Sequence, residues 1–551
     1  MTCKPRTYKA LPPFLTMKAR QKKGTRVTVV RVFDVKTGQP LFQTYKGDMR
    51  GEFSGKKEVF GVFEVRAGIW KKITGKGERL THAPREVINI AKEIKKAGGR
   101  ALLVGGSVRD ALLGIESKDF DIEVYGLETE EIETAINNLN PDHMDTVGRS
   151  FGVIKAKFGE HDLDISLPRR ESKSGKGHRG FEIEGDPNMT PKEAAGRRDF
   201  TINTLAQDPL TGEIIDYFGG HKDLAKGVLR VTDEDKFRED PLRVLRGAQF
   251  AARFNMSVEE RTMEIMQEMT KKEEFRNLPE SRIGEEWRKL LLKGVKPSVG
   301  LEVGLHSGAF EVLHPELTSL KGVPQEYGWH PEGDVWEHTK MTADVAAEII
   351  NREGLEGDEA LVIMLASLTH DIGKSETTEF TEGRWRAKGH AKAGEVLAKE
   401  FLKKLEVGRD IEKKVSKLVK EHMFLSGIDN EPTDRAVDRL AERLQPAKIE
   451  ELVLVMEADR RGRGTEYTKE EEIKNLLHKA SERNVQSSAP VALIGGKHLI
   501  KYLNKKPGPS FGKVLRQVYE AQLDGRVNNI DDALKMASDL FEQIPQAITG
   551  N

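Results

Sequence analysis

The sequence predicts an α+β protein of several domains, in which a small mixed-sheet head follows a basic, β-rich module and precedes an all-α body. Three observations support this fold class. Short apolar runs separated by glycines recur between residues 101 and 167, as in a small sheet. From about residue 233, apolar side chains recur every three or four positions, as in packed helices. Residues 26–68 alternate apolar and polar side chains, as in strands.

Length and composition bound the class of protein. At 551 residues the chain is long enough for about three or four domains. It has no apolar run of about 18 residues and no continuous apolar core near its start, so we expect a cytoplasmic protein that does not enter a membrane. The single cysteine, Cys3, excludes an intrachain disulfide and a thiolate metal cluster.

Charge is unevenly distributed along the chain. Residues 1–80 contain 19 Lys and Arg against 6 Asp and Glu, whereas the whole chain has a net charge of zero. Within this segment, residues 26–35 and 57–68 read as strands, with a turn at 36–40. We interpret it as a small sheet or barrel that contacts the phosphate backbone of RNA. A domain with a solvated basic surface is the alternative.

A pair of aspartates marks the centre of the predicted head. Asp119 and Asp121 stand at positions i and i+2 of an apolar strand, so their side chains share one face about 6–7 Å apart. That separation suits one or two Mg²⁺ ions held by oxygen ligands, although such pairs are common on solvated strand edges. Just before them, Gly105 and Gly106 end an apolar run and begin a helix, which lets the backbone approach a phosphate. The combination predicts nucleotidyl transfer.

Four motifs in order along the chain resemble the class II tRNA nucleotidyltransferase and poly(A) polymerase family. They are VGGSVRDALLGIESKDFDIE at 104–123, SKSGKGHRGF at 172–181, RRDFTIN at 197–203 and EDPLRVLR at 239–246. The resemblance implies catalytic roles for Asp119, Asp121 and Asp164, with Mg²⁺ on the first two; the family often has Glu at the place of Asp164. It implies nucleotide contacts from Gly105, Gly106, Ser107, Arg109, Arg198, Asp199, Asn203, Asp240, Arg243 and Arg246.

The family resemblance assigns base selection to the EDPLRVLR motif. We expect a helix opened by residues 239–240 with Pro241 in its first turn, so that Asp240 and Arg243 share a face. An Asp acceptor beside an Arg donor can complement cytosine or adenine without a nucleic-acid template. A surface salt bridge worth less than about 1 kcal/mol is the alternative. In the family, members that add only CC tend to have a shortened loop at the place of residues 171–180. This loop is not shortened here, so the resemblance favours addition of complete CCA over CC.

A second set of chemistry-bearing residues lies further along the chain. Imidazole and carboxylate ligands suit a first-row divalent metal, and the spacing of this set resembles that of the HD-domain phosphohydrolases. A water on such ions is acidified and can attack a phosphoester, including a 2′,3′-cyclic end. Lys374 is the expected phosphate contact. The expected ligands are His338, His370, Asp371 and Asp459, with His390 and His422 completing a second ion's site.

The resemblance covers about residues 85–551 and is nearest to bacterial CCA-adding enzymes with an appended HD domain. We expect a basic module at 1–80, the head at 81–232, a helical neck and body at 233–325, the HD domain at 326–485 and a helical tail at 486–551. The implied function is addition of CCA to tRNA 3′ ends from CTP and ATP, with a phosphohydrolase activity and a homodimer as the oligomer. A poly(A) polymerase, an HD phosphohydrolase whose head only binds RNA, and an RNA-binding scaffold are the alternatives.

Overall fold

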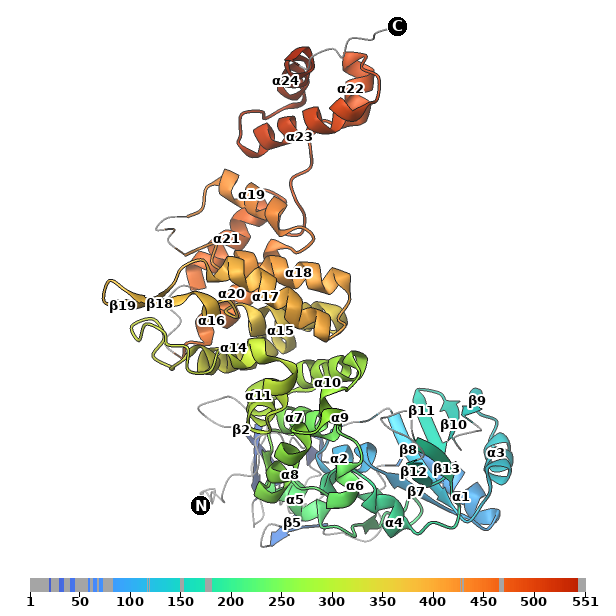
Figure 1. The fold of residues 1–551 in the computed structure, drawn as a ribbon. Helices are drawn as coiled ribbons and strands as arrows, with labels where there is room; N and C mark the ends of the chain where they lie inside the picture. The colour runs from blue at the N-terminus through green and yellow to red at the C-terminus, as the bar shows by residue number, and fades with distance from the viewer. Residues whose placement is uncertain are drawn as a thin grey trace, which may run out of the picture. The chain divides into compact units, whose positions relative to one another are not determined.

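The computed structural model describes residues 83–543 apart from 116, 118, 149–152, 174–180, 427, 429–430 and 465–469, and before residue 83 it describes the backbone of six short strands. The chain forms two compact units, residues 1–313 and 314–551. Figure 1 shows the sheet of the first unit beside its helices, and the helices of the second unit. No helix in the described ranges is both long and apolar enough to cross a membrane.

The head is built on a seven-stranded mixed sheet, as predicted, with the strand order β15-β14-β7-β8-β11-β10-β9. Only β8 and β11 run parallel; every other neighbouring pair is antiparallel. The strands are β7 (Arg100–Val104), β8 (Asp119–Tyr125), β9 (His143–Gly148), β10 (Val153–Phe158), β11 (His161–Ser166), β14 (Ala206–Gln207) and β15 (Ile214–Ile215). The strands β7, β8, β10 and β11 lie within residues 100–167, and the sequence predicted a small sheet at 101–167.

Alternation along β8 explains why the carboxylates face outward. Phe120, Ile122 and Val124 are buried, whereas Asp119 and Asp121 lie on the opposite, exposed face. The helix α1 (Arg85–Lys96) packs beside β7 and buries one apolar stripe, and it also contacts α3 (Thr129–Asn137). The helical face of the sheet is therefore the core, which leaves the carboxylate face open.

The segment before residue 83 contains three antiparallel strand pairs. They are β2 (Val29–Phe33) with β3 (Pro40–Thr44), β5 (Phe63–Arg66) with β6 (Ile69–Lys72), and β1 (Ala19–Arg20) with β4 (Glu58–Val59). Strands therefore occur in both stretches where alternation predicted them. The role of this segment stays a prediction. The loop expected to favour complete CCA addition falls largely on residues 174–180, which lie outside the described residues, between β12 (Arg169–Lys173) and β13 (Phe181–Gly185).

Helices follow the sheet in the first unit. Helix α11 approaches α7 so closely that a Cβ at Gly300 would lie 2.6 Å from the carbonyl oxygen of Ala248, so only glycine fits there. The helices are α2 (Gly106–Leu112), α4 (Pro191–Gly196), the 3₁₀ turn η2 (Thr201–Asn203), α5 (Gly220–Lys226), α6 (Glu234–Arg238), α7 (Arg243–Phe254), α8 (Glu260–Thr270), α9 (Glu273–Arg276), α10 (Glu280–Lys293), α11 (Pro297–His306) and α12 (Ala309–Leu313); the short strands β16 (Val228–Leu229) and β17 (Ser257–Val258) pair in parallel.

Among its described residues, the second unit is helical except for one hairpin. Its central helix is α15 (Gly357–Thr369), in which every residue from Ala360 onward is buried, against α14, α18 and α20. The other elements are α13 (Pro315–Thr318), α14 (Val335–Glu353), α16 (Lys374–Thr377), β18 (Thr378–Thr381), β19 (Arg384–Ala387), α17 (His390–Lys404), α18 (Arg409–Glu421), α19 (Asp434–Leu444), α20 (Ile449–Arg461) and α21 (Glu470–Glu482). A helix that is apolar all round lies in the middle of a bundle.

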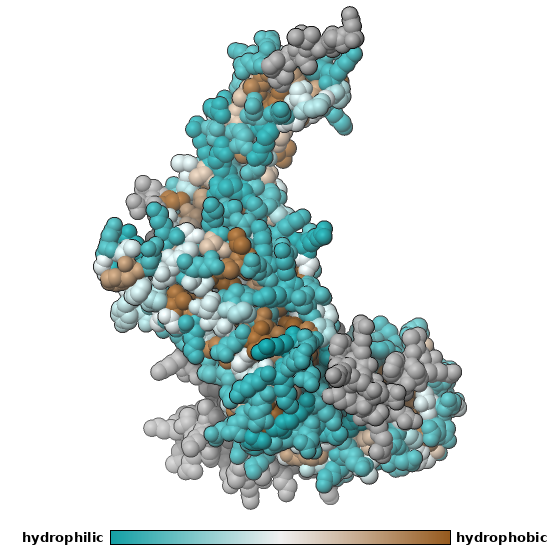
Figure 2. All heavy atoms as spheres, in the orientation of Figure 1, coloured by the Kyte–Doolittle hydropathy of each residue, from teal (hydrophilic) through white to brown (hydrophobic). Residues whose placement is uncertain are grey.

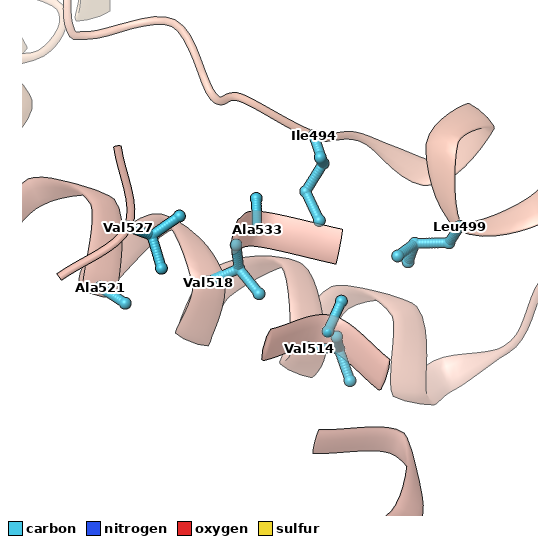
Figure 3. Packing of buried hydrophobic residues seen from close by; sticks show 8 residues of the cluster. Ile494, Leu499, Val514, Val518, Ala521, Val527 and Ala533 are labelled. Atoms are coloured by element: carbon cyan, nitrogen blue, oxygen red, sulfur yellow. The ribbon is translucent and has the colours of Figure 1, made fainter. Parts of the chain in front are cut away.

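The last three helices bury a cluster of their own. Ile494, Leu499, Val514, Val518 and Ala533 are each at most 4% exposed and point toward one another in Figure 3. They come from the segment before and within α22 (Gly496–Leu503), from α23 (Pro509–Leu523) and from α24 (Ile530–Gln543). Pro509 occupies the first turn of α23, where its fixed φ suits a helix start. Helices α22, α23 and α24 lie in the segment for which the sequence predicted a helical tail.

Candidate active sites

The sheet of the first unit brings three acidic side chains to one place. The registers pair Val104 with Asp121 and Asp121 with Asp164, so the end of β7 and both carboxylates lie side by side. Asp119 is on the same face, two residues before Asp121. Burial raises the pKa of Asp121; Arg198 opposes the shift, and the charges of Asp164 and the other nearby carboxylates raise it further. A divalent cation at this face would relieve the repulsion, so the donor set fits Mg²⁺.

Arg198 lies directly over the glycine turn. Gly105 has φ +70°, and a Cβ there would overlap the Arg198 guanidinium and come within 3.9 Å of Asp121 Oδ2. Arg198 Nη2 donates to Glu123 Oε1 at 2.7 Å, while the Tyr125 hydroxyl donates to Glu123 Oε2 at 2.7 Å. A cation, a glycine turn and the carboxylate face are thus adjacent, which is the arrangement needed to hold a triphosphate.

Arg109 lies beneath the turn, about one turn inside α2 as predicted, and is only 3% exposed. Its Nε donates to Asp110 Oδ1 at 2.8 Å, its Nη1 donates to Asn203, and the guanidinium lies 4.5 Å from the centre of the Phe254 ring. Ser107 is also buried and donates to the Val104 carbonyl at 3.3 Å. In this structure the Arg109 cation is engaged by the protein itself, so its predicted triphosphate contact stays a prediction.

A polar chain joins three of the four nucleotidyltransferase motifs. Asn203 Nδ2 donates to Asp199 Oδ1, and Arg246 Nε donates to Asp199 Oδ2 at 2.7 Å. Although burial raises the pKa of Asp199, Arg246 and the hydrogen bond from Asn203 outweigh it and hold that pKa below its ordinary value. At the other end, Arg253 Nη2 lies 3.0 Å from Asp110 Oδ2. Four of the predicted nucleotide-binding residues therefore form one network between α2, η2 and α7.

The structure corrects the prediction for Asp240 and Arg243. Helix α7 begins at Arg243, and Asp240 lies in the turn before it, where its Oδ1 accepts from the Leu242 N–H at 3.1 Å. The two side chains do not share a helix face, because Asp240 is occupied in capping this turn. Asp240 Oδ2 lies 3.2 Å from Arg282 Nη2, and Arg243 donates to two backbone carbonyls, those of residues 236 and 197. The alternative interpretation, a surface salt bridge between Asp240 and Arg243, also differs from these contacts, because Asp240 pairs with Arg282 instead.

Sequence reasoning missed three side chains of this site. Glu123 accepts from Arg198 and from the Tyr125 hydroxyl, and Lys155 Nζ lies 3.3 Å from both carboxylate oxygens of Asp164. Glu123 was detectable, since it continues the i, i+2 series of the two aspartates onto the same face of β8. Lys155 was not, because its position opposite Asp164 depends on the antiparallel register of β10 and β11.

Six side chains converge in the second unit, all of them predicted. His338 lies on α14, Asp459 on α20 and His390 at the start of α17, whereas His370 and His422 directly follow α15 and α18. These five residues and Asp371, which follows His370, are each at most 8% exposed. Burying six such groups without partners is costly, so their convergence points to a ligand that binds them together.

The geometry divides these residues into two adjoining groups that share Asp371. His338 Nε2 lies 3.3 Å from His370 Nε2 and 3.1 Å from Asp459 Oδ1, and His370 Nε2 lies 3.2 Å from Asp371 Oδ2. In the second group, His390 Nε2 lies 3.2 Å from His422 Nε2 and 3.3 Å from Asp371 Oδ1. Each Asp371 oxygen therefore faces one group, as in a bridging carboxylate. Both groups are compact enough to hold one ion each.

The outer ring nitrogens explain why the inner ones are free for a metal. His370, His390 and His422 each place Nδ1 at 2.6 to 2.8 Å from the carbonyl three residues earlier. A carbonyl only accepts, so each Nδ1 carries the proton and each Nε2 presents a lone pair to its neighbour. Burial and the nearby His390 and His370 lower the pKa of His422 to about 3, which keeps this imidazole neutral. The donor set thus fits a pair of first-row divalent ions.

His338 differs from the other three histidines. Its Nδ1 lies 2.8 Å from Glu332 Oε1, and the same oxygen lies 2.9 Å from His330 Nδ1. Burial tends to raise the pKa of Glu332, but the two histidines outweigh it and lower that pKa to about 2. Sequence reasoning missed both Glu332 and His330. The stretch HPEGDVWEH at 330–338 carried the signal, a carboxylate just before the helix of the first ligand.

Two cations border the metal-ligand cluster. Lys374 Nζ lies 2.7 Å from Asp371 Oδ2, and Arg463 Nη2 lies 3.2 Å from Asp459. Burial would raise the pKa values of Asp371 and Asp459, yet these cations and the histidines hold both well below their ordinary range. Lys374 stands where the sequence predicted a phosphate contact, whereas Arg463 was missed. Both place positive charge at the rim of a site that would bind a phosphoester.

Comparison with known protein families agrees with both sites. Residues 101–230 match the poly A polymerase head domain, residues 335–464 match the HD domain, and residues 255–321 match the family described as a probable RNA and SrmB-binding site of polymerase A. The nucleotidyltransferase and HD families are metal-dependent. The head and the histidine cluster are therefore two enzyme domains in one chain.

Curated relatives extend the similarity over most of the chain. It is 36% identical over 370 residues to a protein named multifunctional CCA protein from Xanthomonas campestris pv. campestris, covering 66% of this chain and 85% of the relative. A protein of the same name from Stenotrophomonas maltophilia is 36% identical over 392 residues, with 69% and 91% covered. The chain belongs to the multifunctional CCA protein family, which is part of the class II tRNA nucleotidyltransferases.

Solved structures confirm the fold. The CCA-adding enzyme of Bacillus stearothermophilus in complex with CTP superposes with a TM-score of 0.57 at 19% identity, covering 83% of this chain and 96% of that one. A CCA-adding enzyme in complex with ATP gives a TM-score of 0.56 at 20% identity, covering 85% and 96%. The predicted α+β architecture with a mixed-sheet head and a helical body is therefore confirmed.

Proposed function

We propose that this protein adds C, C and A to the 3′ ends of tRNA from CTP and ATP without a nucleic-acid template, and that its HD site hydrolyses phosphoesters. The alignment of Asp121 with Asp164, next to Arg198 over the Gly105 turn, carries the first part. Relatives at 36% identity share the name multifunctional CCA protein, which supports CCA addition over poly(A) synthesis. tRNA and nucleoside triphosphates as substrates favour the cytoplasm.

In the proposed transfer, the carboxylate face holds the reacting groups and the arginine holds the leaving group. Asp119 and Asp121 would hold Mg²⁺, which lowers the pKa of the primer 3′-OH and neutralises the pyrophosphate. Arg198 would bind the triphosphate beside the Gly105 turn, and Asp164 would orient the attacking hydroxyl. Asp240 and Arg243 would face the base, each held by its own partner rather than by the other.

The nucleotidyltransferase proposal is tested by single-residue variants of the head. Asp121→Asn is expected to lose incorporation of labelled CMP into a tRNA transcript that ends before CCA by at least about 10³-fold, because it removes a metal ligand. Glu160→Gln changes an exposed carboxylate in the turn before β11 and serves as the matched control. Retained incorporation in Asp121→Asn would overturn the assignment of the site.

The proposed hydrolase resides in the second unit. His338, His370, Asp371 and Asp459 would hold one divalent ion, and Asp371, His390 and His422 the other, with Lys374 beside the substrate phosphate. The ions supply an acidified water, and the protein's own side chains place the phosphoester against it. Asp371→Asn is expected to abolish metal-dependent hydrolysis of 2′,3′-cyclic AMP and to leave CMP incorporation unchanged.

A homodimer is the oligomer expected from the sequence. Light scattering, which measures the molar mass in solution, tests this expectation.

A further inference from the structure

Four exposed aromatic side chains border the HD site. Tyr327 is 76% exposed, Trp329 60%, Phe380 59% and Trp385 38%. Wherever the structure describes burial, the only other exposed Phe, Tyr or Trp side chains are Tyr217 and Tyr502. Exposing large aromatic rings forfeits the stabilisation that burial would give, so their concentration at one place suggests a binding surface. We call Tyr327, Trp329, Phe380 and Trp385 the aromatic platform.

The hairpin half of the aromatic platform is rigid. Phe380 on β18 and Trp385 on β19 are cross-strand partners, and their ring centres lie 5.1 Å apart at 66°. The turn between the strands has positive φ at both Glu382 and Gly383, which is the two-residue turn that matches the twist of a hairpin. The strand pairing and the turn therefore fix where the two rings lie relative to each other.

Contacts made by residues next to the four rings link the aromatic platform to the histidine cluster. The carbonyl of Ala387, the last residue of β19, lies 2.7 Å from Nδ1 of His390. The Trp385 N–H donates to Glu326 Oε2 at 3.2 Å, which joins the hairpin to the loop carrying Tyr327 and Trp329. Next along that loop, Gln325 Oε1 accepts from Lys374 Nζ at 2.8 Å, and Lys374 binds Asp371. Both halves thus adjoin residues of the proposed phosphoester site.

The charged side chains around the aromatic platform indicate the kind of ligand that it binds. Residues 378–392 contain two arginines and two lysines against the carboxylates of Glu379 and Glu382, so the hairpin and the segment after it are net positive even though Arg386 pairs with Glu382. In Figure 2 pale and brown residues at the hairpin stand among teal ones. Aromatic faces interleaved with cations bind single-stranded nucleic acids, because every base can stack and the backbone phosphates are anionic. An RNA end whose phosphate reaches the metal ligands would place its terminal base on these rings.

We propose that the aromatic platform stacks the terminal nucleobase of the RNA end on which the HD site acts. The proposal rests on the proposed phosphohydrolase activity and adds its substrate class: a nucleotide end rather than any phosphoester. Base stacking strengthens binding without contacting the reacting phosphate. Loss of a ring should therefore raise KM and leave kcat unchanged.

The test compares two cyclic phosphodiesters that differ in the base. The substrates are 2′,3′-cyclic AMP and glycerol 1,2-cyclic phosphate, which has the same five-membered ring and no base. Trp385→Leu and Trp329→Leu are each expected to raise KM for 2′,3′-cyclic AMP about ten-fold, with kcat and bound-metal content within about two-fold of wild type. KM for the glycerol compound is expected to stay the same. Trp385→Phe should keep most of the binding, and Tyr502→Leu is the control at a remote exposed ring.

A binding measurement separates failure of this proposal from failure of the phosphohydrolase proposal. Binding of the tetranucleotide ACCA can be measured by quenching of tryptophan fluorescence and needs no turnover. The Kd for ACCA is expected to rise about ten-fold in Trp385→Leu. If the wild type hydrolyses neither substrate, the phosphohydrolase proposal fails, and quenching alone decides whether the rings bind RNA. Unchanged KM and unchanged quenching in both leucine variants would overturn the aromatic platform and leave a protein partner as the occupant.

Discussion

At Glu332 one carboxylate oxygen faces the Nδ1 atoms of two histidines, one of which is the predicted metal ligand His338. The other three histidines of the cluster have backbone carbonyls in this position. A carboxylate makes the imidazole a stronger electron donor than a carbonyl does. We therefore expect the ion held by His338 to be bound more tightly than the ion between His390 and His422.

Replacing Glu332 should weaken metal binding. Glu332→Gln removes the charge that holds the His338 ring, so the affinity of the metal-free protein for Mn²⁺ is expected to fall about 10- to 100-fold, as measured by calorimetric titration. Glu337→Gln is the matched control, because Glu337 lies nearby on α14, is exposed and pairs only with Lys340 in the contacts described for it. Equal affinity in the two variants would show that the carboxylate has no such role.

The buried pair of Asp199 and Arg246 predicts a pH dependence of stability. Because the folded-state pKa of Asp199 lies below its unfolded value, the pair contributes stability above about pH 4 that is lost as pH falls through the folded pKa. Asp199→Asn is expected to lower the free energy of unfolding by about 1–3 kcal/mol at pH 7, discounted because Arg246 is 35% exposed. The difference from wild type should shrink toward pH 3 in thermal melts. A difference independent of pH would contradict this account.

Single residues show where sequence reasoning reached its limit. All six residues that converge in the histidine cluster were predicted from the sequence, because each lies in a short motif with its own spacing. Lys155 was missed because it reaches Asp164 through the register of two strands. Glu332 and Arg463 were missed although each lies close in sequence to its partner, His338 and Asp459 respectively. Arg109 was identified as a site residue, yet its burial against Phe254 follows from the approach of α7, which the sequence does not specify.

Gly105, in the turn between β7 and α2, meets two requirements at once: a positive φ, and space for the Arg198 guanidinium beside its backbone. Gly105→Ala would strain a residue at φ +70° and displace Arg198, so we expect KM for CTP to rise at least ten-fold together with a loss of stability of about 1 kcal/mol. Gly98→Ala is the matched control, because Gly98 has φ +98° and nothing within 4 Å of an added Cβ. It should lose similar stability in thermal melts and keep its KM. Equal KM values in the two variants would refute a role for the turn beyond folding.

Strands were predicted more accurately than helix starts at this scale. The carboxylate face of β8 follows from the alternation of buried and exposed side chains from Asp119 to Val124. The start of α7 was placed too early, because Pro241 is favourable in a first helical turn and the sequence gives no sign that Asp240 caps the turn instead. Local propensity allowed both arrangements, and the contact of Asp240 with Arg282 accompanies the one observed.

For the whole molecule, the two candidate sites lie in separate compact units, so each should be lost without the other. The basic segment at 1–80 is a third part with its own prediction. Removing it should reduce the slope of log affinity for tRNA against log salt by about 0.7 to 0.9 for every phosphate that the segment neutralises, as measured from Kd between 50 and 200 mM NaCl. An unchanged slope would rule out phosphate binding by this segment, whose net charge is +13.

The fold class was predictable from the sequence, because the head and the HD cluster carry ordered motifs and the helical body shows regular apolar spacing. The register that aligns Asp121 with Asp164, and the aromatic platform beside the metal ligands, depend on long-range contacts and were visible only in the folded protein.

Incorporation of labelled CTP and ATP, singly and together, into tRNA transcripts ending before C, CC and CCA tests the central claim most directly, with Asp121→Asn alongside. We expect addition to stop after one complete CCA end and to be lost in the variant. Tailing with ATP alone would make the protein a poly(A) polymerase, and absence of incorporation by the wild type would contradict the proposed transferase.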